Sequence, residues 1–157
     1  MSLDFQMVND SKPRSGRPVI VLDGTESVYG RALFAISALY WCAEWLANVE
    51  FRLIDVSDED VLLAVAVLRA DMGADLEVRP SSKDFSPLGD ADLYVAAAFR
   101  SAQHLRLSEA AYGKIPVLLA MQFPDAEYIN GSVLRQRAAF EPKLFAEELY
   151  AIVKPWL

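Results

Sequence analysis

The segment 107–120, LSEAAYGKIPVLLA, joins a helix to a strand and decides the fold class. Residues 108–112 are predicted to be helical, and Gly113 is placed to end the helix in a left-handed cap. The short apolar run at 115–120 follows this break and is typical of a buried strand. Glu109 therefore lies on a helix that leads into a core strand. A solvated structural role and a functional role are both open to it.

The same alternation of strand and helix extends over the rest of the chain. Strands are predicted at 18–23, 50–55, 75–79, 92–98 and 115–120, with helices at 32–47, 58–73, 101–112 and 141–153. Alternating strands and helices favour a parallel sheet with helices on both faces. The sequence therefore predicts a single Rossmann-like three-layer α/β sandwich, with a mainly parallel sheet of about six strands.

Local signals refine these elements. Ser57 is predicted to cap the helix at 58–73, Gly73 to end it, and Pro142 to stand in the first turn of the last helix. The connection from 79 to 92 is short, so at most a turn or two of helix is expected in it. The side chains of Trp41, Cys42 and Trp45 are expected to pack in the core. Trp156, near the end of the chain, is expected to face a partner domain.

Size and charge exclude several classes of function. The 157 residues suit one domain, predicted at 18–157, and the irregular residues 1–17 are interpreted as a tag or linker. A net charge of −7 disfavours binding to nucleic acid. The apolar run at 32–47 is shorter than a bilayer span, so no transmembrane segment is expected. A single cysteine rules out a disulfide within the chain, and we expect a cytoplasmic protein.

Ligands of such sheets bind beyond the carboxyl ends of the strands. The segment after the first predicted strand, DGTESVYG at 23–30, lacks the GxGxxG spacing of dinucleotide-binding proteins and the Gly-Lys-Ser/Thr of a P-loop. Asp23 and Asp55 are the only acids at strand ends that could form the cluster of a receiver domain. These three classes are therefore disfavoured.

The segment 99–117, FRSAQHLRLSEAAYGKIPV, fits an anion site better. If Ser101 caps the helix, the backbone N–H groups of residues 102–104 are free to bind phosphate. Glu109 lies about six residues farther on, or roughly 9 Å at the helical rise. That distance suits a nucleoside ribose, whose two hydroxyls a carboxylate can accept.

The stretch EAAYGKIPV at 109–117 resembles a signature of retaining nucleotide-sugar glycosyltransferases of the glycogen-synthase-like superfamily. In that superfamily the signature belongs to the C-terminal half of the two-domain GT-B fold. GRALFAISALYWCAEWL at 30–46 also resembles the helix that opens this half in some members. The resemblance implies six strands in the order 3-2-1-4-5-6, with the 19–23 strand central.

The resemblance also implies a donor site without a metal or cofactor, in which Glu109 holds the ribose of a nucleotide diphosphate sugar. The residues it assigns to the diphosphate are Gly24, Thr25, Ser101, Ala102, Gln103, His104 and Leu105, with Arg31 and Arg100 as possible cations. Two positions depart from the pattern. Ser101 replaces an acid, and His104 replaces a glycine.

The function implied for the intact enzyme is sugar transfer with retention, in a cleft against an N-terminal Rossmann-like domain that this chain lacks. Alone, the domain is expected to be inactive, because half of the transition-state contacts are absent. Its exposed face makes weak self-association plausible. Two alternatives stay open: a degenerate glycosyltransferase-like domain that serves as a binding or scaffolding module, and a stand-alone binder of another nucleotide.

Overall fold

A computed structural model describes residues 16–24, 31–56, 58–73, 76–78, 88–96, 101–120, 134–136 and 141–157. For Arg31, 101–105 and 134–136 it describes the backbone only. Six strands form one sheet in the order β3-β2-β1-β4-β5-β6, and every neighbouring pair is parallel. The predicted fold class and strand order are both confirmed.

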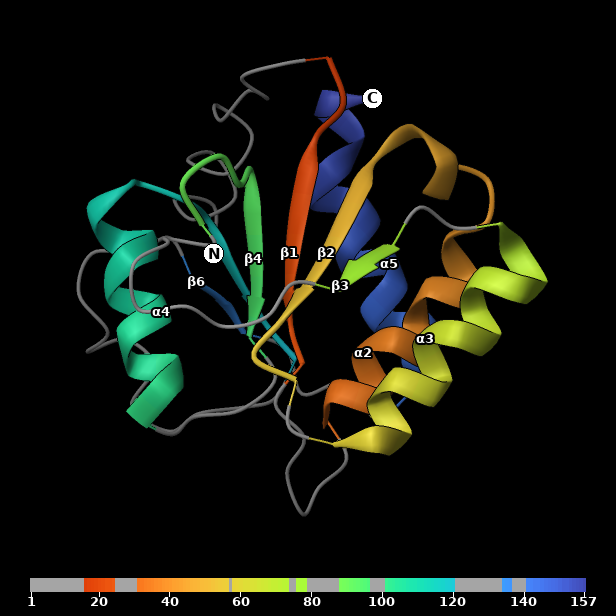
Figure 1. The fold of residues 1–157 in the computed structure, drawn as a ribbon. Coiled ribbons are helices and arrows are strands. Elements are labelled where there is room, and N and C mark those ends of the chain that lie inside the picture. The colour runs from red at the N-terminus through yellow and green to blue at the C-terminus, as the bar shows by residue number, and fades with distance from the viewer. Residues whose placement is uncertain are drawn as a thin grey trace.

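The strands run in one direction through the middle of the molecule, from top to bottom in Figure 1. They are β1 (Val19–Asp23), β2 (Glu50–Ile54), β3 (Leu76–Val78), β4 (Leu93–Ala96), β5 (Val117–Leu119) and β6 (Leu134–Gln136). The first five lie inside the ranges predicted from the sequence. Each of these five is shorter than its predicted range, and the predicted strand residues 75, 79, 97 and 98 lie outside the described residues.

Four α-helices in the described part of the chain cover the sheet. They are α2 (Arg31–Ala38), α3 (Glu59–Met72), α4 (Ser101–Tyr112) and α5 (Pro142–Val153). Figure 1 shows α2, α3 and α5 together on one face and α4 on the other. The change of face occurs between β1, which leads into α2, and β4, which leads into α4.

Alternation along the strands divides the core between these two faces. In β1, Ile20 and Leu22 belong to a large cluster with the side chains of α2, α3 and α5. Val19 and Val21 belong to a smaller cluster with Leu107 and other residues on the α4 side. Successive side chains of a strand point to opposite faces. Asp23, two residues after Val21, therefore faces the α4 side.

The helix predicted at 32–47 is wrong in its second half. α2 ends at Ala38, and two 3₁₀ turns follow, η1 (Leu39–Cys42) and η2 (Leu46–Asn48). Hydrogen bonds between residues three apart continue through this segment, from Trp45 N–H to the Cys42 carbonyl at 3.1 Å and from Asn48 N–H to the Trp45 carbonyl at 3.0 Å. The segment buries Leu39, Cys42 and Trp45, which are spaced by three as the 3₁₀ period requires. A run of apolar residues carries no signal of such a change.

The start of α3 also differs from the prediction. Its N-cap is Asp58 rather than Ser57, and the Asp58 carboxylate accepts the backbone N–H of Asp60 at 2.7 Å. Ser57 lies outside the described residues. Gly73 ends the helix in a left-handed conformation with φ 61°, as predicted. Both residue types are preferred N-caps, so only the hydrogen bond decides between them.

The predicted left-handed cap at Gly113 is wrong by one residue, because Lys114 takes that conformation with φ 56°. The N–H groups of Lys114 and Ile115 donate to the carbonyls of Ala111 and Ala110 at 3.2 and 2.8 Å. These two bonds form a Schellman motif in which Gly113 is the last half-helical residue. A side chain at Gly113 would crowd Ile115, whose Cδ1 would lie 3.3 Å from the added carbon.

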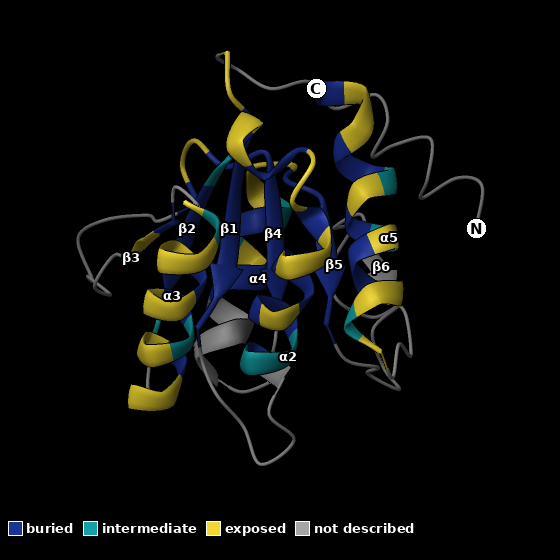
Figure 2. Cartoon of the chain, turned by 90° about the vertical axis from the view of Figure 1, so that its right-hand side faces the viewer, coloured by how far each residue is buried: buried dark blue, intermediate teal, exposed yellow. Residues whose placement is uncertain are grey.

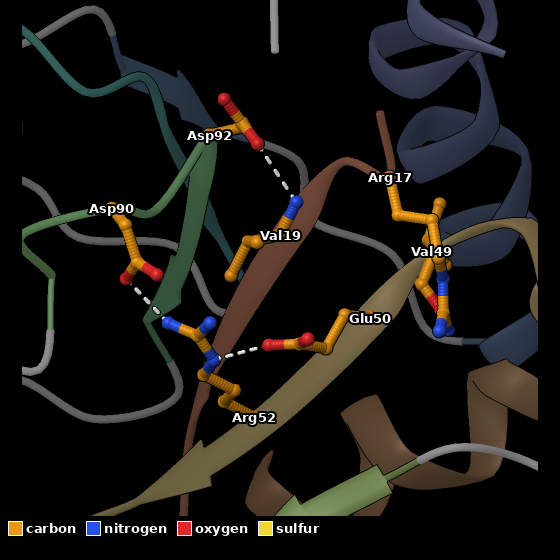
Figure 3. A network of polar contacts seen from close by, with 7 residues as sticks. All are labelled: Arg17, Val19, Val49, Glu50, Arg52, Asp90 and Asp92. Atoms are coloured by element: carbon orange, nitrogen blue, oxygen red, sulfur yellow. Dashed lines mark hydrogen bonds and ion pairs between the residues drawn. The ribbon is translucent and has the colours of Figure 1, made fainter. Parts of the chain in front are cut away.

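Polar contacts fix the amino ends of the central strands (Figure 3). The Val19 N–H donates to the Asp92 carboxylate at 2.8 Å, which ties β1 to the start of β4. Arg52 of β2 forms ion pairs with Glu50 and Asp90. Arg17, assigned from the sequence to the linker, donates to the Val49 carbonyl at 2.7 Å. This edge of the sheet is occupied by structural contacts.

Two of the expectations for tryptophan are wrong. Trp156 is buried in the large cluster on the α2, α3 and α5 side, with 7% of its surface exposed, so it faces the domain's own core. Trp41 is 59% exposed, whereas Trp45 and Cys42 are buried as predicted. Figure 2 shows exposed residues along the outer surface of α3 and α5 on this same face. None of the described helices combines the length and apolar character that crossing a membrane requires.

Candidate functional site

The candidate site lies on the α4 side, near the carboxyl ends of β1 and β2. β1 and β4 are neighbours whose following helices lie on opposite faces, so their carboxyl ends flank a topological switch point. In open α/β sheets, such a switch point is the usual position of a ligand. Among the described residues, Gly24 follows β1 there, and the backbone of α4 begins at Ser101 after β4.

Arg106 of α4 is the centre of the polar contacts in this region. Its Nε and Nη2 donate to the two carboxylate oxygens of Asp55, at 2.9 and 3.2 Å. Its Nη1 donates to Glu109 Oε1 at 2.9 Å. The guanidinium is almost fully buried, and so is the Asp55 carboxylate. A planar guanidinium bound to both oxygens of one carboxylate has a fixed orientation.

The local backbone prepares these contacts. Asp55 directly follows β2 and has a left-handed conformation with φ 56°, which aspartate tolerates better than most residues. Arg106 and Glu109 are three residues apart on α4, so their side chains lie on the same side of the helix. The hydrogen bond to Asp55 is the largest cause of a raised pKa of Arg106, which therefore stays charged.

Glu109 also borders open space. Its side chain is 24% exposed, in contrast to the 8% of Arg106. It lines a cavity of about 560 Å³ together with Leu88, Gly89 and the last turn of α4. An ionised carboxylate accepts hydrogen bonds and donates none, so Glu109 could accept the hydroxyls of a ligand in this cavity. The cavity lies along the second half of α4. The predicted phosphate site is at the other end of this helix, at its N-terminus.

Tyr94 of β4 lies beneath this cluster. Its hydroxyl is the one buried side-chain polar atom that lacks a hydrogen-bond partner in the described part of the chain. Burial, followed by the negative charges of Asp23 and Asp55, raises the pKa of Tyr94 well above its usual value. Asp23 is itself buried, with 1% of its surface exposed. Three carboxylates thus lie near a single arginine.

Gly24 has a packing role at the end of β1. Its N–H donates to the Ile54 carbonyl at 2.6 Å. A Cβ at this position would lie 2.7 Å from Val56 Cγ2 and 2.8 Å from the Ile54 carbonyl oxygen. No side chain fits there, so close packing against the end of β2 explains the glycine. Its predicted contact with a diphosphate remains a prediction.

The other predicted site residues divide into two groups. Thr25 and Arg100 lie outside the described residues. Ser101, Ala102, Gln103, His104 and Leu105 form the first turns of α4, and Arg31 begins α2, each with its backbone alone described. Ser101 is the first helical residue and not the residue before the helix, which differs by one position from the predicted cap. The backbone expected to bind phosphate is therefore helical.

Sequence reasoning missed Arg106 and Tyr94. The i, i+3 spacing of Arg106 and Glu109 on a predicted helix was a usable signal for their ion pair. The contact between Arg106 and Asp55 spans 51 residues and had no local signal. Tyr94 stands in the apolar run of a predicted strand, so only its burial next to the carboxylates distinguishes it.

Comparison with known proteins leaves the family open. No family model and no curated protein matches the chain. Among solved structures, a protein assigned as an aspartate carbamoyltransferase of Leishmania major matches with 16% identity and a TM-score of 0.40. That match covers 99% of this chain and 54% of the other, so the chain spans about half of its length. A truncated 3-deoxy-D-arabino-heptulosonate 7-phosphate synthase from Thermotoga maritima matches with 23% identity and a TM-score of 0.26, over 67% of this chain and 40% of the other.

Proposed function

We propose that this chain is the donor-binding domain of a nucleotide-sugar transferase, with the nucleoside diphosphate bound at the switch point between β1 and β4. The observation that carries the proposal is the change of helix side between these two neighbouring strands, which opens the sheet edge to a ligand there. The likeness of residues 109–117 to the glycosyltransferase signature supports the same assignment. Sugar transfer itself would require a second domain to bind the acceptor.

Glu109 is the residue we assign to the ribose. It is on the α4 helix, it is partly exposed, and one of its oxygens is already oriented by the Nη1 of Arg106. A carboxylate is the group that commonly accepts the two hydroxyls of a ribose. Arg106 then acts as a positioning residue, because its own donors are directed at Asp55 and Glu109.

A diphosphate at this edge would need positive charge from other groups. The free N–H groups in the first turn of α4 and the positive end of its dipole offer part of it. Arg31 and Arg100 are the side chains we assign to the remainder. Transfer would then proceed by electrostatic stabilisation of the leaving phosphate by this chain's own backbone and side chains.

A second candidate function is supported by the charges of the cluster. Asp23, Asp55 and Glu109 carry three negative charges against one on Arg106, and the whole chain carries −7. Excess negative charge opposes a diphosphate. A degenerate transferase-like domain that serves as a binding or scaffolding module would keep the fold and the ion pairs without a need for phosphate.

Titration calorimetry with UDP, GDP and ADP distinguishes the two candidates. If the donor-binding proposal is correct, at least one nucleotide binds, and Glu109→Gln weakens its binding by about 1 to 3 kcal/mol. Glutamine retains an oxygen for Arg106, so the fold should survive the change. A matched control is Glu59→Gln in the first turn of α3, on the other face of the sheet, which should leave nucleotide affinity unaltered.

Three results would count against the donor-binding proposal. Nucleotide binding that Glu109→Gln leaves unaltered would remove Glu109 from the site. The absence of binding to all three nucleotides would favour the degenerate module. Equal affinity for a nucleotide diphosphate with and without an attached sugar would instead favour a binder of another nucleotide.

A further inference from the structure

A second pocket lies on the opposite face of the sheet from α4. It is enclosed by the end of η1, the turn that follows it, and α5, and its volume is about 240 Å³. Its aromatic walls are Trp41, Trp45 and Tyr150, and its polar lining is Glu44, Lys143 and Glu147. The pocket lies across the sheet from the cluster around Arg106, so it does not depend on the proposed nucleotide site.

The aromatic walls are unusually open. Trp41 has 59% of its surface exposed, and Tyr150 has 39%. Trp45 is buried behind them and lies against Tyr150, with 5.9 Å between ring centroids and an angle of 34° between the planes. An exposed tryptophan forgoes the large gain in free energy that burial of its ring would bring. A flat apolar surface is therefore presented to solvent on a packed support.

The polar lining offers both acceptors and a donor. The carboxylates of Glu44 and Glu147 make no hydrogen bond or ion pair with the described part of the chain. Lys143 places its ammonium 5.6 Å from the centroid of the Trp41 ring. Each ammonium carries three donors, and each carboxylate carries several acceptor positions. A ligand in the pocket would thus meet two acceptor groups and one donor group next to the ring.

These groups select the chemical class of the ligand. A second cation at Trp41 would be repelled by Lys143, and an anion would face two carboxylates. A purely apolar ligand would take the charged groups out of water without giving them partners. A neutral ring with an apolar C–H face and many hydroxyls has none of these costs, because hydroxyls both donate and accept.

We propose that the pocket formed by Trp41, Tyr150, Glu44, Lys143 and Glu147 is a binding site for one unit of a neutral saccharide. The sugar ring lies on the Trp41 indole, and its hydroxyls bond to the carboxylates and the ammonium. The pocket volume suits one ring and not a long segment of polymer. The site anchors a sugar and takes no part in chemistry.

The test is NMR titration of the ¹⁵N-labelled full chain with maltotriose, cellotriose and mannotriose. We expect the indole N–H signal of Trp41 to shift in a saturable way with at least one of them, at millimolar affinity. The indole of Trp156, buried near the C-terminus, is an internal control and should not shift. Trp41→Ala should weaken binding by at least about tenfold. Glu147→Gln should weaken it severalfold.

Leu63→Ala is the matched control, since Leu63 is 63% exposed on α3 and does not line the pocket. It should leave saccharide affinity unchanged. The proposal is overturned if none of the three saccharides shifts the Trp41 signal, or if Trp41→Ala binds them as well as the unaltered chain. A stronger response to choline than to the saccharides would also overturn it, in favour of a cation site. UDP, GDP and ADP titrated into Trp41→Ala report separately on the nucleotide proposal.

Discussion

The two faces of the sheet are stabilised in different ways. The α2, α3 and α5 side contains a large apolar cluster, with Phe51, Leu68 and Phe145 fully buried. The α4 side has a smaller apolar cluster that ends at the carboxylates around Arg106. Removal of apolar side-chain area should therefore lower the unfolding free energy most on the α2, α3 and α5 side. Changes of charge should lower it most on the α4 side. The difference indicates that the first side mainly holds the domain together and that the second can carry a polar site.

The largest effect that separates the two sides is expected from Arg106→Met. The change leaves the buried Asp55 carboxylate and the Glu109 carboxylate without their shared partner, which costs about 3 to 5 kcal/mol of unfolding free energy. Chemical denaturation measures it. Arg69→Met on α3 is the matched control, because within the described residues the Arg69 side chain donates to the Leu76 carbonyl alone, and a loss of about 1 kcal/mol is expected. If the two variants lost the same unfolding free energy, the ion pairs of Arg106 with Asp55 and Glu109 would not behave as a buried unit.

The apolar side is tested by Leu68→Ala. Leu68 is fully buried on the inner side of α3, so the change should cost about 3 kcal/mol through lost apolar contact and a residual cavity. Leu63→Ala, on the outer side of the same helix, should cost less than about 0.5 kcal/mol. Both variants replace a leucine of α3 by alanine, so the change in helix propensity is the same in each. A reversal of the two costs would show that α3 packs through its other side.

Cys42 makes the apolar side sensitive to alkaline pH. Burial raises the pKa of its thiol from 9.0 to about 12. Between these values the unfolded chain releases the proton and the folded chain retains it, so stability is complete below pH 9.0 and falls as the pH rises toward about 12. The loss is at most about 1.4 kcal/mol per pH unit. In Cys42→Ala, denaturation curves across this range should show a shallower decline. An unchanged decline would exclude the thiol as its source.

The smallest expected change in unfolding free energy comes from removing a tyrosine hydroxyl, and its sign differs between the two sides of the sheet. Tyr94→Phe removes a buried hydroxyl that has no hydrogen-bond partner, so the domain should gain up to about 1 kcal/mol. Tyr40→Phe removes an exposed hydroxyl that bonds to Asp71 at 3.4 Å, and should be neutral or slightly destabilising. Thermal unfolding of both variants makes the comparison. A loss of stability in Tyr94→Phe would reveal a partner for the hydroxyl.

Weak self-association stays a prediction, and the apolar side gives it a location. Along α3, the side chains of Leu62, Leu63 and Val67 are all exposed, and Figure 2 shows this outer surface. An exposed apolar stripe of this kind is a frequent site of contact between proteins. Light scattering over a range of protein concentrations would detect the association.

The sequence by itself determined the α/β class, the parallel sheet and the positions of five strands. These features follow from local patterns: the alternation of strand and helix, the short apolar run at 115–120, and the glycine that ends α3 at Gly73. It also marked Glu109 as a residue of interest, from its position on a helix before a core strand. Interactions between residues close in sequence suffice for each of these conclusions.

Only the tertiary structure decided which groups meet. Asp55 and Arg106 are far apart in sequence, and their ion pair depends on β2 ending opposite the middle of α4. Trp41 and Trp156 exchanged their expected environments, because burial of a large ring depends on the space left by neighbouring elements. An apolar run such as 32–47 likewise contains no sign of where α2 gives way to η1. Burial and charge pairing are properties of the packed chain, and residue order fixes them only through the fold.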